Sequence, residues 1–494
     1  MDSTADQGPR LSLRALLAEP AAEHRVASEL FVRGLAIVYV IAFASLAVQI
    51  DGLAGPDGIL PFGRALSRAL AGYGYSAVWQ IPTLFWLGSS DWALLGASLA
   101  GVVIAVLLLV GIGHRRLLLI ALYVLYLSLY QAGQIFTSFQ WDSLLLECGF
   151  LAIFLAGTPT RVVVWLYHWL LFRLRFESGW FKLASGDPTW RDFSALDYYF
   201  ETQPLPHAGS WYAHQLPHTW LHAGVGFTYL AELIVPFLIF LPRPFRIFAA
   251  AVTIVAQLLI IATSNHNFIN LLTILLCLFV LDDRIVTRCV PAKFVARIEA
   301  RTTARAVPPI LVGLAAALIV ATSVATFLVT QMRRPLPETV YTIASIAPEF
   351  GIGSVFHLFP TMQTERQELQ IEGSDDGIVW RVYEFRYKPG PLDVRPAFIV
   401  PHQPRLDWMM WFVPPQSSRT DYWFGPFLQA LRENRPAVTA LLARNPFEGM
   451  APPQRLRVRA YRYRFTTPAE RALTGNWWSA ELLGEYPDVP PRQP

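Results

Sequence analysis

A single lysine stands beside a long apolar run, where an amine could do acid–base chemistry. Lys182 is one of only three lysines in the chain. If its amine is desolvated at the end of a membrane helix, it could act as a base or hold a substrate. The alternative is an interfacial lysine whose long stem lets the charge reach water. His266, in the polar triplet Asn265-His266-Asn267 between two apolar runs, is the second candidate, and its alternative role is to hydrogen-bond a helix turn.

Three histidines recur at four-residue intervals and could form a metal-binding stripe. His214, His218 and His222 would share one face of a continuous helix, and imidazole nitrogens are good zinc ligands. Pro217 lies inside the run and is expected to break that helix. The sequence therefore favours polar histidines at a membrane interface, and we predict neither a metal nor another cofactor.

Several common catalytic and binding motifs are missing. The chain has no Gly-x-Ser-x-Gly elbow, no P-loop, no His-Glu-x-x-His and no Cys-x-x-Cys pair. Its net charge is +4 without a long basic run, which argues against nucleic acid as a partner. A non-enzymatic role is therefore the first hypothesis, and a membrane-embedded enzyme is the second.

The elements that must position these residues are membrane helices. Hydrophobic residues make up 54% of the 494 residues and charged residues only 15%, which excludes a wholly soluble enzyme and a disordered chain. Runs of about 20 apolar residues are long enough to cross a bilayer. We expect a polytopic α-helical membrane bundle in residues 1–334, with about nine spans near 30–50, 91–113, 116–137, 144–157, 161–180, 219–241, 245–263, 267–281 and 308–329. The fifth carries Arg173, Arg175 and Glu177, so it must face protein or water.

Cationic residues are distributed unevenly between the connections. Arginines precede the first span and gather in 282–307, and with nine spans these connections share the cytoplasmic side. The exported side then holds a structured loop, 181–218, and the whole tail, 335–494. We expect an integral protein of the inner (plasma) membrane with a periplasmic tail, or of the endoplasmic reticulum membrane with a lumenal tail if the source is eukaryotic.

The tail, 335–494, is predicted to be a soluble, mostly-β domain. Val340–Ile346 alternates loosely, and two alternating runs, 368–372 and 378–387, flank a Gly/Asp-rich turn that is typical of a hairpin. Arg455–Phe465 predicts a strand whose change of phase indicates a bulge. Phe427–Leu442 indicates a helical pair broken at Pro436. The hairpin resembles that of galactose-binding-type β-sandwiches, so we expect a β-sandwich.

Several sequence motifs resemble those of the lipase maturation factor family. They are Lys182-Leu183, 185–190 (SGDPTW), 195–206 (ALDYYFETQPLP), 383–390 (YEFRYKPG), 401–408 (PHQPRLDW) and 441–447 (LLARNPF). With the polar triplet and Trp211-Tyr212 they supply candidate binding or structural residues: Trp190, Asp197, Glu201, Gln203, Pro204, Trp211, Asn265, Asn267, His402, Arg405, Asp407, Trp408 and Asn445. The resemblance implies a membrane-anchored maturation factor that helps secreted lipases fold and assemble. Its expected partners are membrane lipids and an exported client protein, such as a lipase.

A fainter likeness supports the second hypothesis. Gly179-Trp180-Phe181-Lys182-Leu183, followed by Trp190, looks like the horizontally transferred transmembrane (HTTM) domain shared with vitamin K-dependent carboxylases. In those enzymes a lysine at the corresponding place is the catalytic base, so the resemblance implies catalytic Lys182 and His266. The two hypotheses differ in geometry: an enzyme needs both side chains within hydrogen-bond reach of one polar cavity, and a scaffold leaves them in separate contacts.

Overall fold

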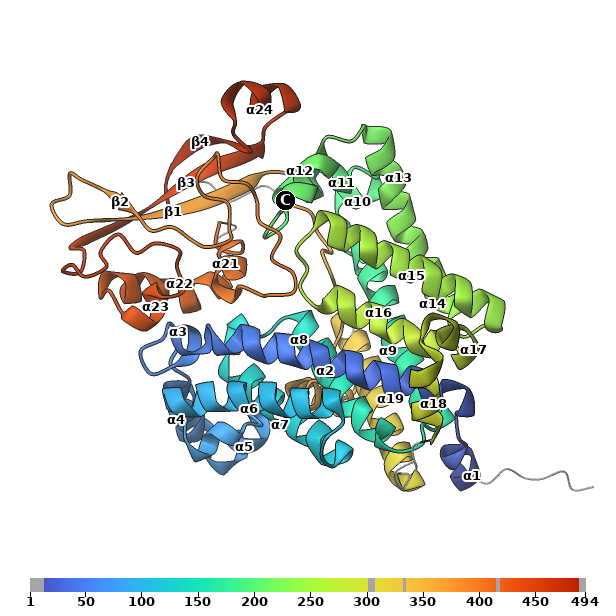
Figure 1. Ribbon diagram of the computed structural model, residues 1–494. Coiled ribbons are helices and arrows are strands. Elements are labelled where there is room, and N and C mark those ends of the chain that lie inside the picture. The colour runs from blue at the N-terminus through green and yellow to red at the C-terminus, as the bar shows by residue number, and fades with distance from the viewer. Residues whose placement is uncertain (1–12, 301–306, 332–334, 415–417, 488–494) are drawn as a thin grey trace, which may run out of the picture.

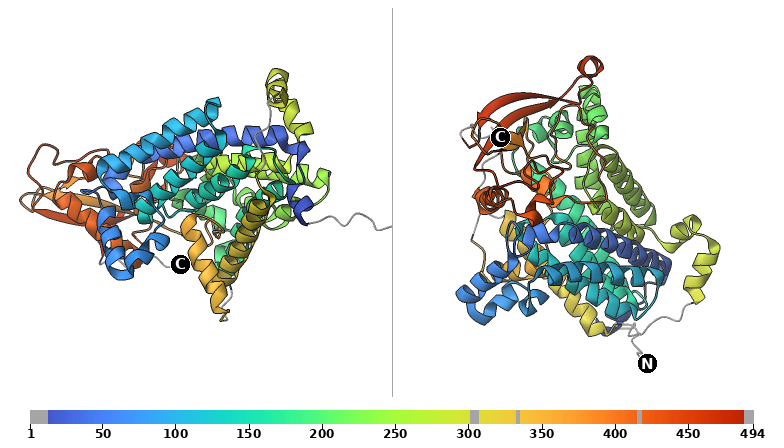
Figure 2. Two further views of the ribbon diagram at one scale, coloured as in Figure 1. Left: turned by 90° about the horizontal axis from the view of Figure 1, so that it is seen from below. Right: turned by 60° about the vertical axis from the view of Figure 1, so that its left-hand side comes forward.

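The computed structural model describes residues 13–300, 307–331, 335–414 and 418–487. A helical bundle makes up most of the molecule, and a small antiparallel sheet with short helices lies at one end of it (Figure 1). Both views of Figure 2 keep the sheet and the red part of the tail at the same end of the bundle. The fold is therefore a mostly helical membrane domain that carries a tail domain.

Six helices among the described residues are long and apolar enough to cross a membrane. They are Ala22–Ala47, which contains α2 (Arg25–Ala47); α6 (Asp91–Val110); α7 (Arg115–Ala132); His218–Leu238, formed by α13 (His218–Tyr229), a π-helical turn (Leu230–Ile234) and α14 (Val235–Leu238); α15 (Arg243–Thr263); and α19 (Pro309–Gln331). α6 packs closely on α2, because a Cβ at Gly101 would lie 2.3 Å from the Phe43 ring.

The expectation of about nine spans is not confirmed. The runs near 144–157, 161–180 and 267–281 form α8 (Gln140–Ala152), α9 (Arg161–Ala184) and α16 (Ile269–Val280). α8 has 13 residues and α16 has 12, too few for roughly 30 Å of hydrocarbon at about 1.5 Å per residue. α9 is long enough, but it carries Arg173, Arg175 and Glu177, which are buried in protein as their charges predicted.

The basic connections gather at the end of the bundle away from the sheet (Figure 1). Asp283, in α17 (Asp283–Val286), accepts hydrogen bonds from the first turn of α2. Arg243 at the start of α15 pairs with Asp282. Arg25 donates to the carbonyl of Ile298 in α18 (Ala292–Ala300). These connections therefore share one side of the bundle.

The tail contains one four-stranded antiparallel sheet in the order β2-β1-β3-β4. Its strands are β1 (Arg366–Ser374), β2 (Arg381–Val382), β3 (Arg455–Phe465) and β4 (Trp478–Glu485). The hairpin is confirmed, with Glu372 opposite Val382, although its second strand is short. The predicted bulge in β3 falls between Ala460 and Tyr461, where the register with β4 shifts. The β-sandwich is not confirmed, since the described part of the tail forms a single sheet.

Short helices complete the tail. They are α21 (Arg405–Met410), α22 (Ser418–Arg432), α23 (Pro436–Thr439) and α24 (Pro468–Thr474), and the predicted break at Pro436 separates α22 from α23. The predicted strand at Val340–Ile346 is wrong, because these residues belong to α20 (Glu338–Ile346). Pro337 at the N-cap and Glu338 in the first turn are helix-start signals that outweigh the loose alternation.

The loop 181–218 is mostly helical. α10 (Pro188–Arg191), α11 (Ala195–Thr202) and α12 (Ala208–His214) lie between α13, α15 and the sheet (Figure 1). Apolar packing joins the described part of the tail to the membrane domain at several places. Leu53 and Phe136 pack against residues of α21–α23, Trp211 of α12 packs against Trp477 and Trp478, and Phe356 and Trp408 belong to the main core of the bundle.

Candidate functional site

Lys182 lies in the last turn of α9 and is only 4% exposed. Its Nζ donates to Glu232 Oε2 at 2.8 Å, to the Leu358 carbonyl at 2.9 Å and to the Ser178 carbonyl at 3.3 Å. Glu232 is carried by the π-helical turn, which displaces side chains relative to a regular helix. Lys182 is therefore the cation of a buried ion pair. An interfacial lysine would reach water, and Lys182 does not.

The partner Leu358 belongs to a segment, residues 347–362, that follows α20 and runs among the membrane helices; we call it the connecting segment. Three carboxylates of the membrane domain accept its backbone N–H groups: Glu147 from Gly353 at 3.1 Å, Glu177 from Phe356 at 2.8 Å and Asp187 from Met362 at 2.9 Å. These carboxylates belong to α8, to α9 and to the N-cap of α10. Buried carboxylates thus hold the start of the tail inside the bundle.

Trp190 and His266 pack around the same segment. The indole N–H of Trp190 donates to the Phe359 carbonyl at 3.1 Å. His266 Nε2 pairs with the Tyr199 hydroxyl, and its ring lies 5.1 Å from the Phe359 ring and 6.0 Å from that of Trp408. Burial lowers the pKa of His266 to about 3, so the imidazole is neutral at physiological pH. Lys182 and His266 hydrogen-bond to different partners, and the carboxylase-like alternative gains no support from their geometry.

The other residues of the polar triplet serve the backbone. Asn265 donates to the carbonyls of Leu205 at 3.0 Å and Ala397 at 2.9 Å, and it accepts from the Ile399 N–H at 3.0 Å. Asn267 has a φ of 63° and accepts from the backbone N–H of Phe268, where α16 begins. Asn265 therefore ties the bundle to the tail, and Asn267 shapes a helix start.

The motif 195–206 (ALDYYFETQPLP) contacts the tail through Arg366. Arg366 of β1, 1% exposed, donates to the backbone carbonyls of Glu201, Gln203 and Pro204. The carboxylate of Glu201 accepts from the Phe465 N–H of β3 at 2.6 Å. Burial raises the pKa of Glu201. These motif residues face β1 and β3, and most of their polar atoms are engaged at the junction.

Trp211 and the tail motif PHQPRLDW add further buried contacts. Trp211 Nε1 donates to the Thr466 carbonyl at 2.9 Å. His402 lies 3.0 Å from the Ser45 hydroxyl of α2, and Trp408 packs edge-on against Trp141 of α8 with ring centroids 5.0 Å apart. All these contacts run between the tail and the membrane domain.

Arg405 makes the most buried ion pair of the junction. It binds Asp142 of α8 through two hydrogen bonds of 2.6 and 2.7 Å, and it donates to the Phe136 carbonyl at 3.0 Å. Asp407 accepts from the N–H groups of Tyr387 and Lys388 at 2.7 and 2.9 Å, and burial raises its pKa. Arg405 thus joins the domains, whereas Asp407 orders the tail itself.

Asn445 also acts within the tail. Its amide donates to the Asn434 side chain at 2.8 Å and accepts from the Phe447 N–H at 3.1 Å. It contributes to the turn after α23 rather than to the junction.

Asp197 is the exception, because it faces two histidines near the surface. Its two oxygens lie 3.0 Å from His218 Nδ1 and 3.1 Å from His222 Nε2. Pro217 separates His214 on α12 from the other two, as predicted, but it also caps α13 and leaves His218 and His222 on adjacent turns. One ligand atom from each of Asp197, His218 and His222 lies within 4.8 Å of the other two, so these three residues could hold a divalent metal.

An open groove lies on the tail, outside the family motifs and beside the basic strand Arg455–Phe465. It has a volume of about 640 Å³ and lies between β3 and α22, lined by Arg432, Arg455, Arg457, Trp380 and Leu428 among others. The Arg457 guanidinium stacks 4.1 Å from the centre of the Trp380 ring and pairs with Glu372. The groove combines three arginines and one carboxylate, Glu485, with apolar walls.

Sequence reasoning missed the acidic residues that make the junction. Asp142, Glu147 and Glu232 are buried and each pairs with a cation. The signal that could have found them is a carboxylate inside an apolar run, since such a group is retained only when it has a partner.

Comparison with known proteins identifies the family. Residues 26–288 match the model of the lipase maturation factor transmembrane domain, and residues 352–489 match that of its C-terminal domain. Lipase maturation factor 2 of Gallus gallus is 34% identical over 93% of this chain and 80% of its own length. Lipase maturation factor 1 of Bos taurus is 34% identical over 92% and 87%, and lipase maturation factor 2 of Homo sapiens 32% over 94% and 82%. No solved structure matches the chain significantly. With its apolar helices, the chain is an integral membrane protein that belongs to the lipase maturation factor family.

Proposed function

We propose that the chain is a membrane-anchored maturation factor that binds an exported client protein, such as a lipase, through its tail. The names of its relatives support the role in maturation. The single observation that carries the binding proposal is the contrast between the junction and the groove. The candidate motif residues at the junction are mostly buried, whereas the groove between β3 and α22 is open.

The junction supports this role by fixing the tail in one orientation. Arg405 is held by Asp142 of α8, and Arg366 is held by carbonyls of the motif ALDYYFETQPLP. Residues that are buried in this way cannot contact a client unless the domains separate. We therefore propose that the family motifs position the tail and that the groove contacts the client.

The chemistry of the groove indicates what it binds. Arg432 and Arg455 bring positive charge, while Trp380 and Leu428 supply apolar surface. Arginine and tryptophan are enriched among residues that dominate binding energy at interfaces. The groove suits an acidic segment of a partly folded client that also carries apolar side chains.

We also propose that the tail lies on the exported side. The basic connections lie together at the opposite end of the bundle, and such connections are usually cytoplasmic. The tail would then be periplasmic in a bacterium and lumenal in the endoplasmic reticulum of a eukaryote.

The test is a photo-crosslinking amino acid placed at Leu428, with a matched probe at Leu473 on α24, which is 88% exposed and outside the groove. We expect exported proteins to crosslink at Leu428 and much less at Leu473. Charge reversal by Arg432→Glu with Arg455→Glu should abolish the crosslinks, and Arg444→Glu, at an exposed arginine elsewhere, should not. Equal crosslinking at both probes, or crosslinks that survive charge reversal, would contradict the groove as the client site.

A further inference from the structure

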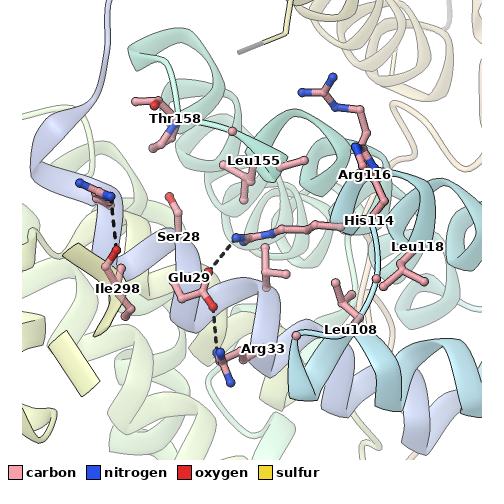
Figure 3. Close-up of a pocket in the computed structure, with 18 of the residues that line it drawn as sticks. Ser28, Glu29, Arg33, Leu108, His114, Arg116, Leu118, Leu155, Thr158 and Ile298 are labelled. Carbon is pink, nitrogen blue, oxygen red and sulfur yellow. Dashed lines mark hydrogen bonds and ion pairs between the residues drawn. The ribbon is translucent and has the colours of Figure 1, made fainter. Parts of the chain in front are cut away.

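A second hollow lies at the other end of the molecule, among the basic connections (Figure 3). Its volume is about 360 Å³. Among the described residues, four arginines line it, Arg25 and Arg33 from α2 and Arg115 and Arg116 from the start of α7, together with the carboxylate Glu29.

Glu29 orients two of these arginines. Its Oε1 accepts from Arg33 Nε at 2.9 Å and its Oε2 accepts from Arg115 at 2.7 Å, while Arg33 also donates to the Leu109 carbonyl at 3.0 Å. The Arg33 and Arg115 side chains are 26% and 29% exposed, so both remain accessible from the hollow. One carboxylate therefore fixes the geometry of two guanidinium groups.

The remaining walls mix the polar side chains Ser28, His114 and Thr158 with apolar side chains, and they lie beside exposed apolar surface. Leu108, Leu118 and Leu155 line the hollow, and Val110 and Ile112 at the end of α6 are 55% and 60% exposed. A ligand seated here would meet guanidinium groups at one end and apolar surface at the other.

We propose that this pocket binds a phosphate group, a monoester or diester, which in the membrane is supplied by an anionic phospholipid headgroup. Guanidinium groups match the geometry of phosphate oxygens through paired hydrogen bonds. Basic pockets between membrane helices are a general means of holding anionic headgroups. The alternative source of the same chemistry is free phosphate from solution.

The test measures binding to the full chain in detergent as a shift in unfolding temperature. The probes are dioctanoyl phosphatidylglycerol, inorganic phosphate, and dioctanoylglycerol, which has the acyl chains without the phosphate. We expect phosphatidylglycerol to bind and dioctanoylglycerol not to bind. Arg115→Gln should weaken binding by roughly tenfold, since one charge-assisted contact is lost, and Arg116→Gln should weaken it for the same reason. Arg68→Gln, at an exposed arginine on α4 (Phe62–Tyr73), is the matched control and should change nothing.

Each outcome decides the proposal. Binding of phosphatidylglycerol alone identifies the lipid as the source, and binding of inorganic phosphate with the same dependence on Arg115 identifies free phosphate. Equal binding of dioctanoylglycerol, or affinity that is unchanged in Arg115→Gln, overturns the proposal. If Arg115→Gln does not fold, the weaker binding expected for Arg116→Gln carries the test, and unchanged binding in that variant also overturns the proposal.

Discussion

Removing the guanidinium of Arg405 should separate the tail from the membrane domain. Arg405 is 1% exposed and Asp142 is fully buried, and two hydrogen bonds join them at 2.6 and 2.7 Å. Arg405→Met keeps most of the side-chain volume but leaves the Asp142 carboxylate without its counter-ion. Breaking a buried pair by removing one partner typically costs about 3–5 kcal/mol, because a charge is left buried. We expect a loss of that size in the free energy of unfolding.

The assay is a double-mutant cycle in detergent, with denaturant unfolding followed by tryptophan fluorescence. Arg405→Met and Asp142→Asn should each be strongly destabilising, and the double variant should lose less than the sum of the two, because it leaves no unpaired charge. Limited proteolysis of Arg405→Met should release the tail at protease concentrations that leave the parent intact. The matched control is Arg444→Met, which breaks the exposed pair with Glu384 and should change stability by less than about 1 kcal/mol.

Two results would refute this reasoning. The first is a loss for Arg405→Met no greater than that for Arg444→Met. The second is strict additivity in the cycle, which would mean that the two buried groups do not interact in the folded protein.

Three further outcomes are expected. Lys182→Met should lower the free energy of unfolding by about 1–3 kcal/mol in a denaturant titration, because Glu232 then keeps only its more distant cation, Arg175 at 3.6 Å; an unchanged free energy of unfolding would contradict a structural role for the Lys182–Glu232 pair. The pKa of His266 is held near 3 against the usual 6.5, so between these values only the unfolded chain takes up the proton and stability falls as pH drops. The free energy of unfolding should change by up to about 1.4 kcal/mol per pH unit in this range, and this pH dependence should be smaller in His266→Gln. An unchanged pH dependence in the variant would count against a neutral buried imidazole. Gly52→Ala should cost about 1–3 kcal/mol in a denaturant titration, because its Cβ would lie 2.4 Å from the Ala437 carbonyl oxygen of the tail; a neutral effect would mean that the two domains are not in contact there.

The sequence predicted the helices and strands better than the way they meet. Apolar runs predicted the long membrane helices, and the alternation in Arg455–Phe465 predicted β3 with its bulge. Periodicity carries such local information because one face of each element must be buried. The run 161–180 looked like a membrane span because hydropathy counts apolar residues and does not show whether buried charges have partners.

The candidate residues were found, but their role could not be read from spacing. Arg405 and Asp142 are 263 residues apart in the chain, and the same separation could have left both exposed to a client. Trp190 and Trp211 were candidate binding or structural residues, and both are buried. Only the three-dimensional contacts distinguish a residue that fastens two domains from one that binds a partner.

The pairing of Asp142 with Arg405 has a consequence for biosynthesis. A ribosome that adds roughly 5–20 residues per second completes Asp142 about 13–50 s before it reaches Arg405, since 263 residues separate them. During that interval the α8 carboxylate must stay hydrated or take up a proton, because its counter-ion does not yet exist. The ion pair between α8 and the tail can therefore form only after residue 405 has been made, and a ribosome that stops earlier leaves Asp142 without this counter-ion.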